Sequence, residues 1–195
     1  MHGVKAAGFA HAHLPFPDIP AILGLIKELA DYEKELSSVE ATVEKLGSTI
    51  AFAPSELSPG EPTTDARGLP ITEPTSPLRP ARCLLLYAPD DDKTAVGMAL
   101  YFYNYSTWRA KAGIYLEDLY VTPHQRNKGY GKLLLVNLAR EVVAMDGGRL
   151  DWSVLKWNEP SIRFYEDVIG ATRQEEWVGM RVDGEGLVKL SKLLD

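Results

Sequence analysis

Apolar side chains recur at helical spacing near the start of the chain. After Asp18, apolar residues follow one another at steps of three and four, and charged residues stand between them; the apolar members are Ile19, Ile22, Leu23, Ile26, Leu29 and Ala30. This pattern predicts an amphipathic helix that is N-capped by Asp18 and runs to about Glu33.

A second, shorter helix is predicted just beyond the first. Residues 37–40 read Ser-Ser-Val-Glu, which has the spacing of a capping box, and Val43 and Leu46 follow as apolar positions. Gly47 is expected to end this helix, because glycine readily adopts the left-handed conformation in which helices stop.

The middle of the chain has the pattern of β-strands. Residues 82–87, 94–105 and 113–121 are rich in apolar and aromatic side chains, and residues 88–93 contain the Pro and Asp residues of a turn. We expect three strands joined by antiparallel hairpins.

Helical spacing returns in the last third of the chain. Apolar residues from Leu134 to Met145 predict a helix over residues 131–145 that Gly147-Gly148 end. The elements expected after it are a strand over 150–155, a helix over 160–169 closed by Gly170, and two strands over 172–176 and 177–182. This order of elements predicts a single mixed α/β layer structure.

Residues 54–80 interrupt the pattern. Seven of the chain's 13 prolines fall there among Ser, Thr, Glu and Gly, with almost no large apolar residues. Such a segment cannot pack a core of its own, so we expect a mobile surface loop inserted between two elements and assign it no fold. A proline-reading partner is the alternative to a tolerated insertion.

Composition limits the class of protein. The chain has 195 residues, 45% of them apolar, and 21 Lys+Arg against 27 Asp+Glu give a net charge of -6. This profile fits one ordinary domain over residues 1–195. An acidic balance without a Lys- or Arg-rich run argues against nucleic acid as a partner and favours a cationic ligand.

Cysteine and histidine usage narrows the setting. Cys83 is the single cysteine, so no internal disulfide framework is expected, and its apolar neighbours indicate a core residue rather than a nucleophile. No apolar stretch approaches the roughly 20 residues that cross a bilayer, and no signal peptide is evident. We expect a cytoplasmic setting and no membrane partner. His2, His11, His13 and His124 lack metal-ligand spacing, and no metal is expected.

The turn after Val121 carries candidate chemistry. It contains Arg126-x-x-Gly129-x-Gly131 and then Lys132, just before the predicted helix. Free backbone N–H groups and the helix dipole can hold a pyrophosphate there, and Arg126 and Lys132 can add charge. The spacing is neither the dinucleotide fingerprint nor a P-loop, and a plain strand-to-helix turn is the alternative.

This frame fits R/Q-x-x-G-x-G/A, the acyl-CoA pyrophosphate signature, and here the sequence resembles the GCN5-related N-acetyltransferase (GNAT) superfamily. A second block, Trp157-Asn158-Glu159-Pro160-Ser161-Ile162 followed by Phe164-Tyr165, is similar to its spermidine/spermine and thialysine acetyltransferase branch. Further matches lie at residues 25–33, 101–108 and 115–118. The resemblance implies the GNAT fold, an α/β (α+β) structure with a mixed, mostly antiparallel sheet flanked by helices.

The resemblance also implies a reaction, in which acetyl-CoA as co-substrate acetylates a primary amine of a polyamine or lysine-like molecule by direct transfer. Tyr165 resembles the general acid that protonates the departing CoA thiolate; without the resemblance it reads as a core residue. Glu117 takes the role linked to amine deprotonation, and a surface ion pair is its alternative. Asp118 is a weaker candidate, because neighbours on a regular strand point to opposite faces.

The other site residues follow from the same resemblance. The co-substrate is expected to contact Leu119, Tyr120, Val121, Arg126, Asn127, Lys128, Gly129, Tyr130, Gly131, Lys132, Asn158, Ser161 and Tyr165, with a backbone N–H near Leu119 or Tyr120 holding the acetyl carbonyl. The amine is expected to contact Tyr32, Glu33, Trp108, Glu117, Asp118, Glu176 and Trp177, with Glu175 beside them. The branch also implies a homodimer.

Three departures from the branch leave the amine open. Ser106 stands where polyamine enzymes carry an acidic residue, Asp151 stands where the polyamine enzyme carries a histidine, and the loop after Trp108 is one residue longer. A protein or histone lysine N-acetyltransferase is the alternative enzyme. A non-catalytic acyl-CoA-binding module is the alternative from another class.

Overall fold

The computed structural model describes residues 12–13, 18–53, 63–88 and 91–194 of the chain. It divides into two compact units, Met1–Ser153 and Val154–Asp195. Each unit is described by itself. In the described residues, no helix is both long and apolar enough to cross a membrane.

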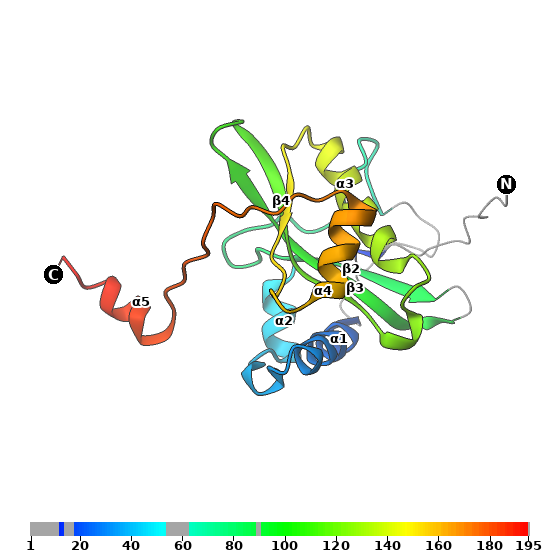
Figure 1. Ribbon diagram of the computed structural model, residues 1–195, viewed down its shortest axis with the longest axis horizontal. Helices are drawn as coiled ribbons and strands as arrows, with labels where there is room; N and C mark the ends of the chain where they lie inside the picture. The colour runs from blue at the N-terminus through cyan, green and yellow to red at the C-terminus, as the bar shows by residue number, and fades with distance from the viewer. Residues whose placement is uncertain (1–11, 14–17, 54–62, 89–90, 195) are drawn as a thin grey trace. The chain divides into compact units, whose positions relative to one another are not determined.

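The first unit is built on a five-stranded sheet in the order β1-β2-β3-β4-β5 (Figure 1). The strands are β1 (Ala12–His13), β2 (Arg82–Ala88), β3 (Asp91–Ser106), β4 (Lys111–Val121) and β5 (Leu150–Trp152). Neighbours from β1 to β4 pair antiparallel, and β5 pairs parallel to β4. The predicted mixed, mostly antiparallel sheet is therefore confirmed; the strand predicted over 150–155 is shorter, and β1 was not predicted.

The predicted first helix is present as α1 (Ile19–Tyr32). Its apolar stripe packs on one face of the sheet, where Ile22 and Leu25 meet Leu85 of β2 and Met98 of β3 in the main core. Asp18 occupies the N-cap position, but its side chain makes no capping hydrogen bond. It interacts instead with Tyr87, so the predicted side-chain cap is wrong.

The second helix, α2 (Val43–Thr49), begins differently from the prediction. Thr42 caps it by accepting a hydrogen bond from the Lys45 N–H at 3.2 Å. Ser37 and Ser38 of the proposed capping box lie in a short 3-10 helix, η2 (Leu36–Ser38), and Glu40 lies beyond it. Gly47 is buried inside α2 and does not end it. The chain continues through Gly47 because Leu46 is anchored in the core beside it.

The helix α3 (Tyr130–Ala144) covers the opposite face of the sheet. Its buried Glu141 accepts hydrogen bonds from the hydroxyls of Tyr101 (2.7 Å) and Tyr103 (2.6 Å) on β3. Helices therefore cover both faces of the sheet, as predicted for this fold.

The described part of the proline-rich segment has defined local structure. Asp65 organises a turn, because its carboxylate accepts hydrogen bonds from the backbone N–H groups of Arg67 and Leu69, both at 2.9 Å. The Arg82 side chain at the start of β2 donates to Thr72 at 2.8 Å, which ties the segment to the sheet. Residues 63–80 thus have local structure that the sequence analysis did not assign, their mobility stays a prediction, and residues 54–62 lie outside the described part.

The second unit begins with α4 (Glu159–Arg163), which continues into a π-helix, η4 (Phe164–Ile169). Gly170 ends this helix with φ 79°, as predicted. The two strands predicted over 172–176 and 177–182 are absent, and a short helix, α5 (Gly184–Leu190), follows instead. The apolar pattern of residues 172–182 has no strand to pair with inside this unit, and a lone strand leaves its backbone groups unpaired.

Candidate active site

A β-bulge on β4 organises the carboxylates of the candidate site. Leu116 lies opposite Tyr101 of β3, whereas Asp118 lies opposite the adjacent Leu100, so Glu117 is the extra residue between two regular stretches of the ladder. A bulge breaks the alternation of side chains along a strand. The objection that Glu117 and Asp118 must point to opposite faces therefore does not hold here.

Asp118 lies on the sheet face that packs against α1. Its cross-strand partner Leu100 packs against the core on that face, and the charge of Asp118 acts on buried Cys83. Burial, together with the neighbouring charges of Glu117 and Glu33, raises the pKa of Asp118 to about 6. Three carboxylates from α1 and β4 are thus electrostatically coupled, and a cation is the ligand that would relieve their repulsion.

Tyr32 and Glu33 stand at the C-terminal end of α1, as predicted. Glu33 is the C-cap residue, and its backbone N–H donates to the Leu29 carbonyl at 2.9 Å. Burial raises the pKa of the Glu33 carboxyl. The charges of Glu33 and Glu117 both act on Asp118, so these three carboxyl groups lie near one another within the first unit.

The turn between β4 and α3 has the shape expected of an anion-binding loop. After a short 3-10 helix, η3 (Pro123–Gln125), Asn127 and Gly129 adopt positive φ values of 62° and 83°. Gly129 is the N-cap of α3 and supplies no capping side chain, so the first N–H groups of the helix are open to a ligand. A Cβ at Gly129 would meet no atom within 4 Å, which leaves room in front of these donors.

The basic residues of this turn have distinct surroundings. The Lys128 ammonium donates to the Gln125 side chain at 2.6 Å. The Arg126 Nε–H donates to the Val121 carbonyl at 2.9 Å, and its guanidinium lies over the rings of Tyr32 and Tyr120. Lys132 is exposed in the first turn of α3. Arg126 thus links the turn between β4 and α3 to the end of β4 and, through Tyr32, to the end of α1.

The outer edge of β4 opens beside the bulge. Strand β5 pairs with Ile114, Tyr115 and Leu116 and then ends, whereas β3 remains paired with β4 as far as Val121. In the described residues, the edge of β4 from Glu117 to Val121 therefore has no strand partner on the β5 side. This is the stretch in which a backbone N–H near Leu119 or Tyr120 was expected to hold the acetyl carbonyl.

The second unit carries the other predicted co-substrate residues. Asn158 is the N-cap of α4, and its side-chain oxygen accepts a hydrogen bond from the Ser161 N–H at 3.4 Å. Tyr165 lies in η4, with its ring 5.4 Å from that of Phe164. These residues belong to one helical segment, so they share a common scaffold.

Glu175, Glu176 and Trp177 line a hollow of about 760 Å³ within the second unit. Arg173, on the wall of that hollow, forms an ion pair with Glu166. Trp108 lies in the first unit at the turn between β3 and β4, and 91% of its surface is exposed. The predicted amine-side residues of the first unit thus lie at the end of α1, at the bulge of β4 and at the turn after β3, and those of the second unit line its hollow.

The departures from the polyamine pattern have structural roles. Ser106 is buried at the end of β3. Asp151 accepts a hydrogen bond from Asn104 at 2.9 Å and pairs with Arg149 at 2.6 Å. Asp151 therefore joins β3 to β5, and its charge is already matched.

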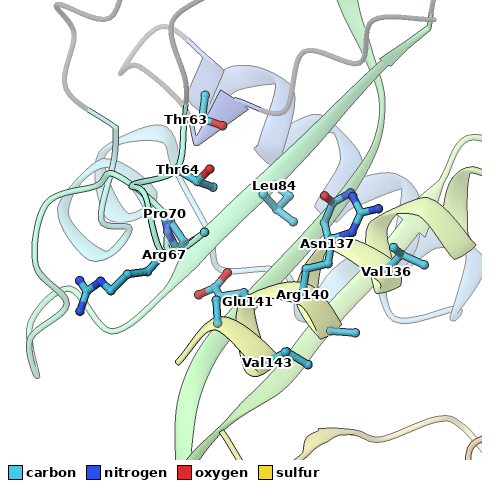
Figure 2. A pocket seen from close by; sticks show the side chains of 13 residues that line it. Thr63, Thr64, Arg67, Pro70, Leu84, Val136, Asn137, Arg140, Glu141 and Val143 are labelled. Atoms are coloured by element: carbon cyan, nitrogen blue, oxygen red, sulfur yellow. The ribbon is translucent and has the colours of Figure 1, made fainter. Parts of the chain in front are cut away.

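A groove that the sequence did not predict lies on the α3 face of the sheet. Figure 2 shows Thr63, Thr64 and Pro70 on one side of the groove and the side chains of α3 on the other, with Leu84 between them and the Arg67 side chain pointing away from α3. Its volume is about 710 Å³. Glu141 lines it, but both of its oxygens already accept tyrosine hydroxyls. The proline-rich segment thus forms a wall of a groove on the face opposite Asp118.

Cys83 is buried, and burial raises the pKa of its thiol, which suits a core residue rather than a nucleophile. Within the described ranges, no group of three His, Cys, Asp or Glu side chains is placed to hold a metal ion.

Comparison with known proteins finds similar sequences and a similar fold. A family model described as "Acetyltransferase (GNAT) family" matches residues 54–171. The L-ornithine N5-acetyltransferase NATA1 of Arabidopsis thaliana is 33% identical over 95% of this chain and 89% of its own length. The thialysine N-epsilon-acetyltransferase of Caenorhabditis elegans is 30% identical over 87% of this chain and 89% of its own. An integron cassette protein from the mobile metagenome of V. cholerae has a similar fold, with a TM-score of 0.67 at 22% identity over 94% of this chain and 98% of its own.

Proposed function

Because the chain belongs to the acetyltransferase (GNAT) family and is an N-acetyltransferase of amine substrates, we propose that it acetylates a primary amine of a small, lysine-like or polycationic molecule. The acetyl donor in this proposal is acetyl-CoA, and transfer is direct within a ternary complex. The amines that we favour are ornithine- or thialysine-like, with spermidine and spermine as the polyamine alternative.

The observation that carries the proposal is the coupled group of Glu33, Glu117 and Asp118. Their mutual repulsion and burial keep the pKa of Asp118 near 6, so an arriving ammonium group gains from two or three carboxylates at once. Such a site prefers a small cation with more than one positive centre over a neutral amine.

Acetyl-CoA is assigned to the turn between β4 and α3. The open N–H groups at the start of α3 and the free space before Gly129 support a pyrophosphate there, with Lys132 nearby in the first helical turn. The unpaired edge of β4 supports an acetyl carbonyl held by a backbone N–H near Leu119 or Tyr120. Asn158, Ser161 and Tyr165 are assigned to the same co-substrate through the resemblance.

The proposed reaction combines acetyl transfer with proton transfers to and from the chain. Glu117, acting through water, removes a proton from the ammonium, and the neutral amine attacks the thioester carbon. The new C–N bond forms, the C–S bond breaks, and Tyr165 protonates the CoA thiolate. The second amine proton restores Tyr165.

The enzyme is proposed to be a homodimer. Leu100, which faces Asp118, and Ser106, which ends β3, are six positions apart. Because a strand rises about 3.3 Å per residue, Ser106 lies roughly 20 Å along β3 from Leu100, and Trp108 lies in the turn beyond Ser106. An ornithine-sized amine at Asp118 does not reach Trp108 of its own subunit, so we place Trp108 against the amine bound to the partner subunit.

The cytoplasmic setting expected from the sequence remains a prediction.

A thiol-release assay with acetyl-CoA tests the proposal. The panel is L-ornithine, thialysine, L-lysine, spermidine, spermine and a histone-tail peptide, and we expect the highest kcat/KM for a free amine. Turnover confined to the peptide would favour a protein N-acetyltransferase, and CoA binding without any turnover would favour a non-catalytic module.

The dimer has its own test. Mixing Trp108→Ala and Glu117→Gln chains creates heterodimers with one intact site and one site that carries both lesions. We expect the mixture to recover activity that neither homodimer has. A sedimentation result that shows only monomers, or no recovery on mixing, would contradict the shared site.

A further inference from the structure

The Arg126 side chain is held between α1 and the end of β4. Its guanidinium carbon lies 5.1 Å from the ring centroid of Tyr32 and 5.6 Å from that of Tyr120. Its Nε–H donates to the Val121 carbonyl at 2.9 Å. One side chain of the co-substrate turn therefore contacts the last residue of α1 and two residues of β4.

These contacts converge on the helix end that carries Glu33. The Tyr120 hydroxyl donates to Glu28 of α1 at 3.2 Å, so β4 holds the same helix by a second bond. The Arg126 guanidinium reaches α1 over the face of the Tyr32 ring, so its link to this helix is a cation–π contact.

The end of α1 is suited to respond to such a contact. Lys34, just after Glu33, has a φ of 66°, which is unfavourable for a residue other than glycine. Backbone hydrogen bonds from Lys34 to Asp31 (3.0 Å) and from Glu35 to Ala30 (2.8 Å) close the helix around it. These two bonds form a Schellman cap with Lys34 at the left-handed position that glycine usually occupies, so packing from outside the helix can offset the unfavourable angle and help to keep the turn ordered.

We propose that Arg126 is a positioning residue that couples the co-substrate turn to the C-terminal end of α1. When CoA occupies the turn, the backbone around Arg126 becomes fixed, and the contact between Arg126 and Tyr32 orders the helix end that presents Glu33 to the amine. The inference rests on the proposed placement of CoA. It predicts that binding of CoA orders the end of α1, which is proposed to contact the amine, although CoA does not contact this helix end itself.

Hydrogen–deuterium exchange with CoA as the only ligand tests this coupling. In the wild-type chain, we expect CoA to slow exchange several-fold at residues 126–133 and also at residues 29–36. Arg126→Lys keeps a cation for phosphate but loses the planar fork and the Nε–H, and Tyr32→Leu removes the ring that Arg126 contacts. In both variants, protection by CoA should persist at 126–133 and disappear at 29–36.

Two matched variants complete the design. Tyr32→Phe keeps the ring and should retain the wild-type protection, and Arg140→Lys, on the exposed surface of α3, should behave as wild type. Protection at 126–133 without protection at 29–36 in the wild type, or equal protection at 29–36 in all variants, overturns the coupling. Binding of CoA without protection at 126–133 overturns the proposed co-substrate site itself, which is a different result.

Discussion

Asp118 of β4 and Glu33 of α1 are distant in sequence, yet the charge of Glu33 acts on the Asp118 carboxyl in the folded chain. The two groups meet because Asp118 lies on the face of the sheet that α1 covers. The pairing places an ionisable group with a pKa of about 6 next to a second carboxylate, and this arrangement has consequences for both stability and binding.

The first prediction concerns Asp118→Asn. The pKa of Asp118 is raised from 3.8 to about 6, so between these pH values the folded state binds more protons than the unfolded state. Stability therefore falls as the pH rises through this window, by up to about 3 kcal/mol, since each unit of pKa difference corresponds to about 1.4 kcal/mol. Asn cannot ionise, so the variant should gain stability over the wild type at pH 8 and little at pH 4.

Urea unfolding of both proteins at the two pH values measures this difference. Other titrating groups are shared and largely cancel in the comparison. An equal difference in unfolding free energy at pH 4 and pH 8 would contradict the assigned pKa. Amine binding should correspondingly weaken below about pH 6, because the protonated carboxyl no longer attracts the cation.

A second prediction concerns Tyr165→Phe. If Tyr165 protonates the leaving thiolate, its hydroxyl acts in the transition state and contributes little to ground-state binding. We expect kcat to fall about 100-fold or more while the Kd for acetyl-CoA changes little. Tyr105→Phe, on the exposed end of β3, is the matched control and should keep full activity. A large rise in Kd with unchanged kcat would assign Tyr165 to binding instead.

A third prediction concerns the buried Glu141. Glu141→Leu removes the acceptor of the Tyr101 and Tyr103 hydroxyls and leaves Arg82 without its neighbouring carboxylate. We expect a loss of about 3 kcal/mol or more in unfolding free energy, because buried polar groups lose their partners. Arg140→Ala, at the adjacent exposed position, should change stability by about 0.5 kcal/mol or less. Similar losses for both variants would mean that the buried bonds contribute nothing specific.

A fourth prediction compares the effects of alanine substitution on stability at two glycines, Gly113 and Gly24. A Cβ at Gly113 would lie 2.5 Å from the Asn104 side-chain oxygen and 2.8 Å from the Arg149 carbonyl, so Gly113→Ala should destabilise the sheet by about 1–3 kcal/mol. A Cβ at Gly24, inside α1, would meet nothing within 4 Å. Gly24→Ala should therefore raise stability by about 0.5–1 kcal/mol, because alanine restricts the unfolded chain and favours the helix. Thermal unfolding should show Tm shifts of opposite sign.

The sequence predicted those helices and strands in which the apolar pattern matches the buried side chains. The stripe from Ile19 to Leu29 and the strands through Leu85, Met98 and Ile114 face a core, so local periodicity reports their structure directly. The sequence also predicted a turn at Gly129 and a helix end at Gly170, and both residues have the positive φ angles that favour glycine.

What the sequence could not predict depends on partners that are remote in the chain. Residues 172–182 have strand-like composition, but a strand needs a neighbouring edge, and the second unit supplies none. The cap of α2 is Thr42 rather than the Ser37 box because the register of that helix follows the burial of Leu46. The bulge at Glu117 depends on the pairing of β4 with β3, and no local signal marks it.

The bulge makes the Glu117 side chain independent of the cross-strand pairing of β4. Leu116 and Asp118 face consecutive residues of β3, Tyr101 and Leu100, so Glu117 is surplus to the ladder. A chain lacking residue 117 could keep every cross-strand pair on either side and leave each neighbouring side chain on its present face. Its sheet would then form as before, with one carboxylate fewer beside Asp118. In β4, deletion of Glu117 therefore tests the role of this carboxylate while the pairing of the strand with β3 is kept.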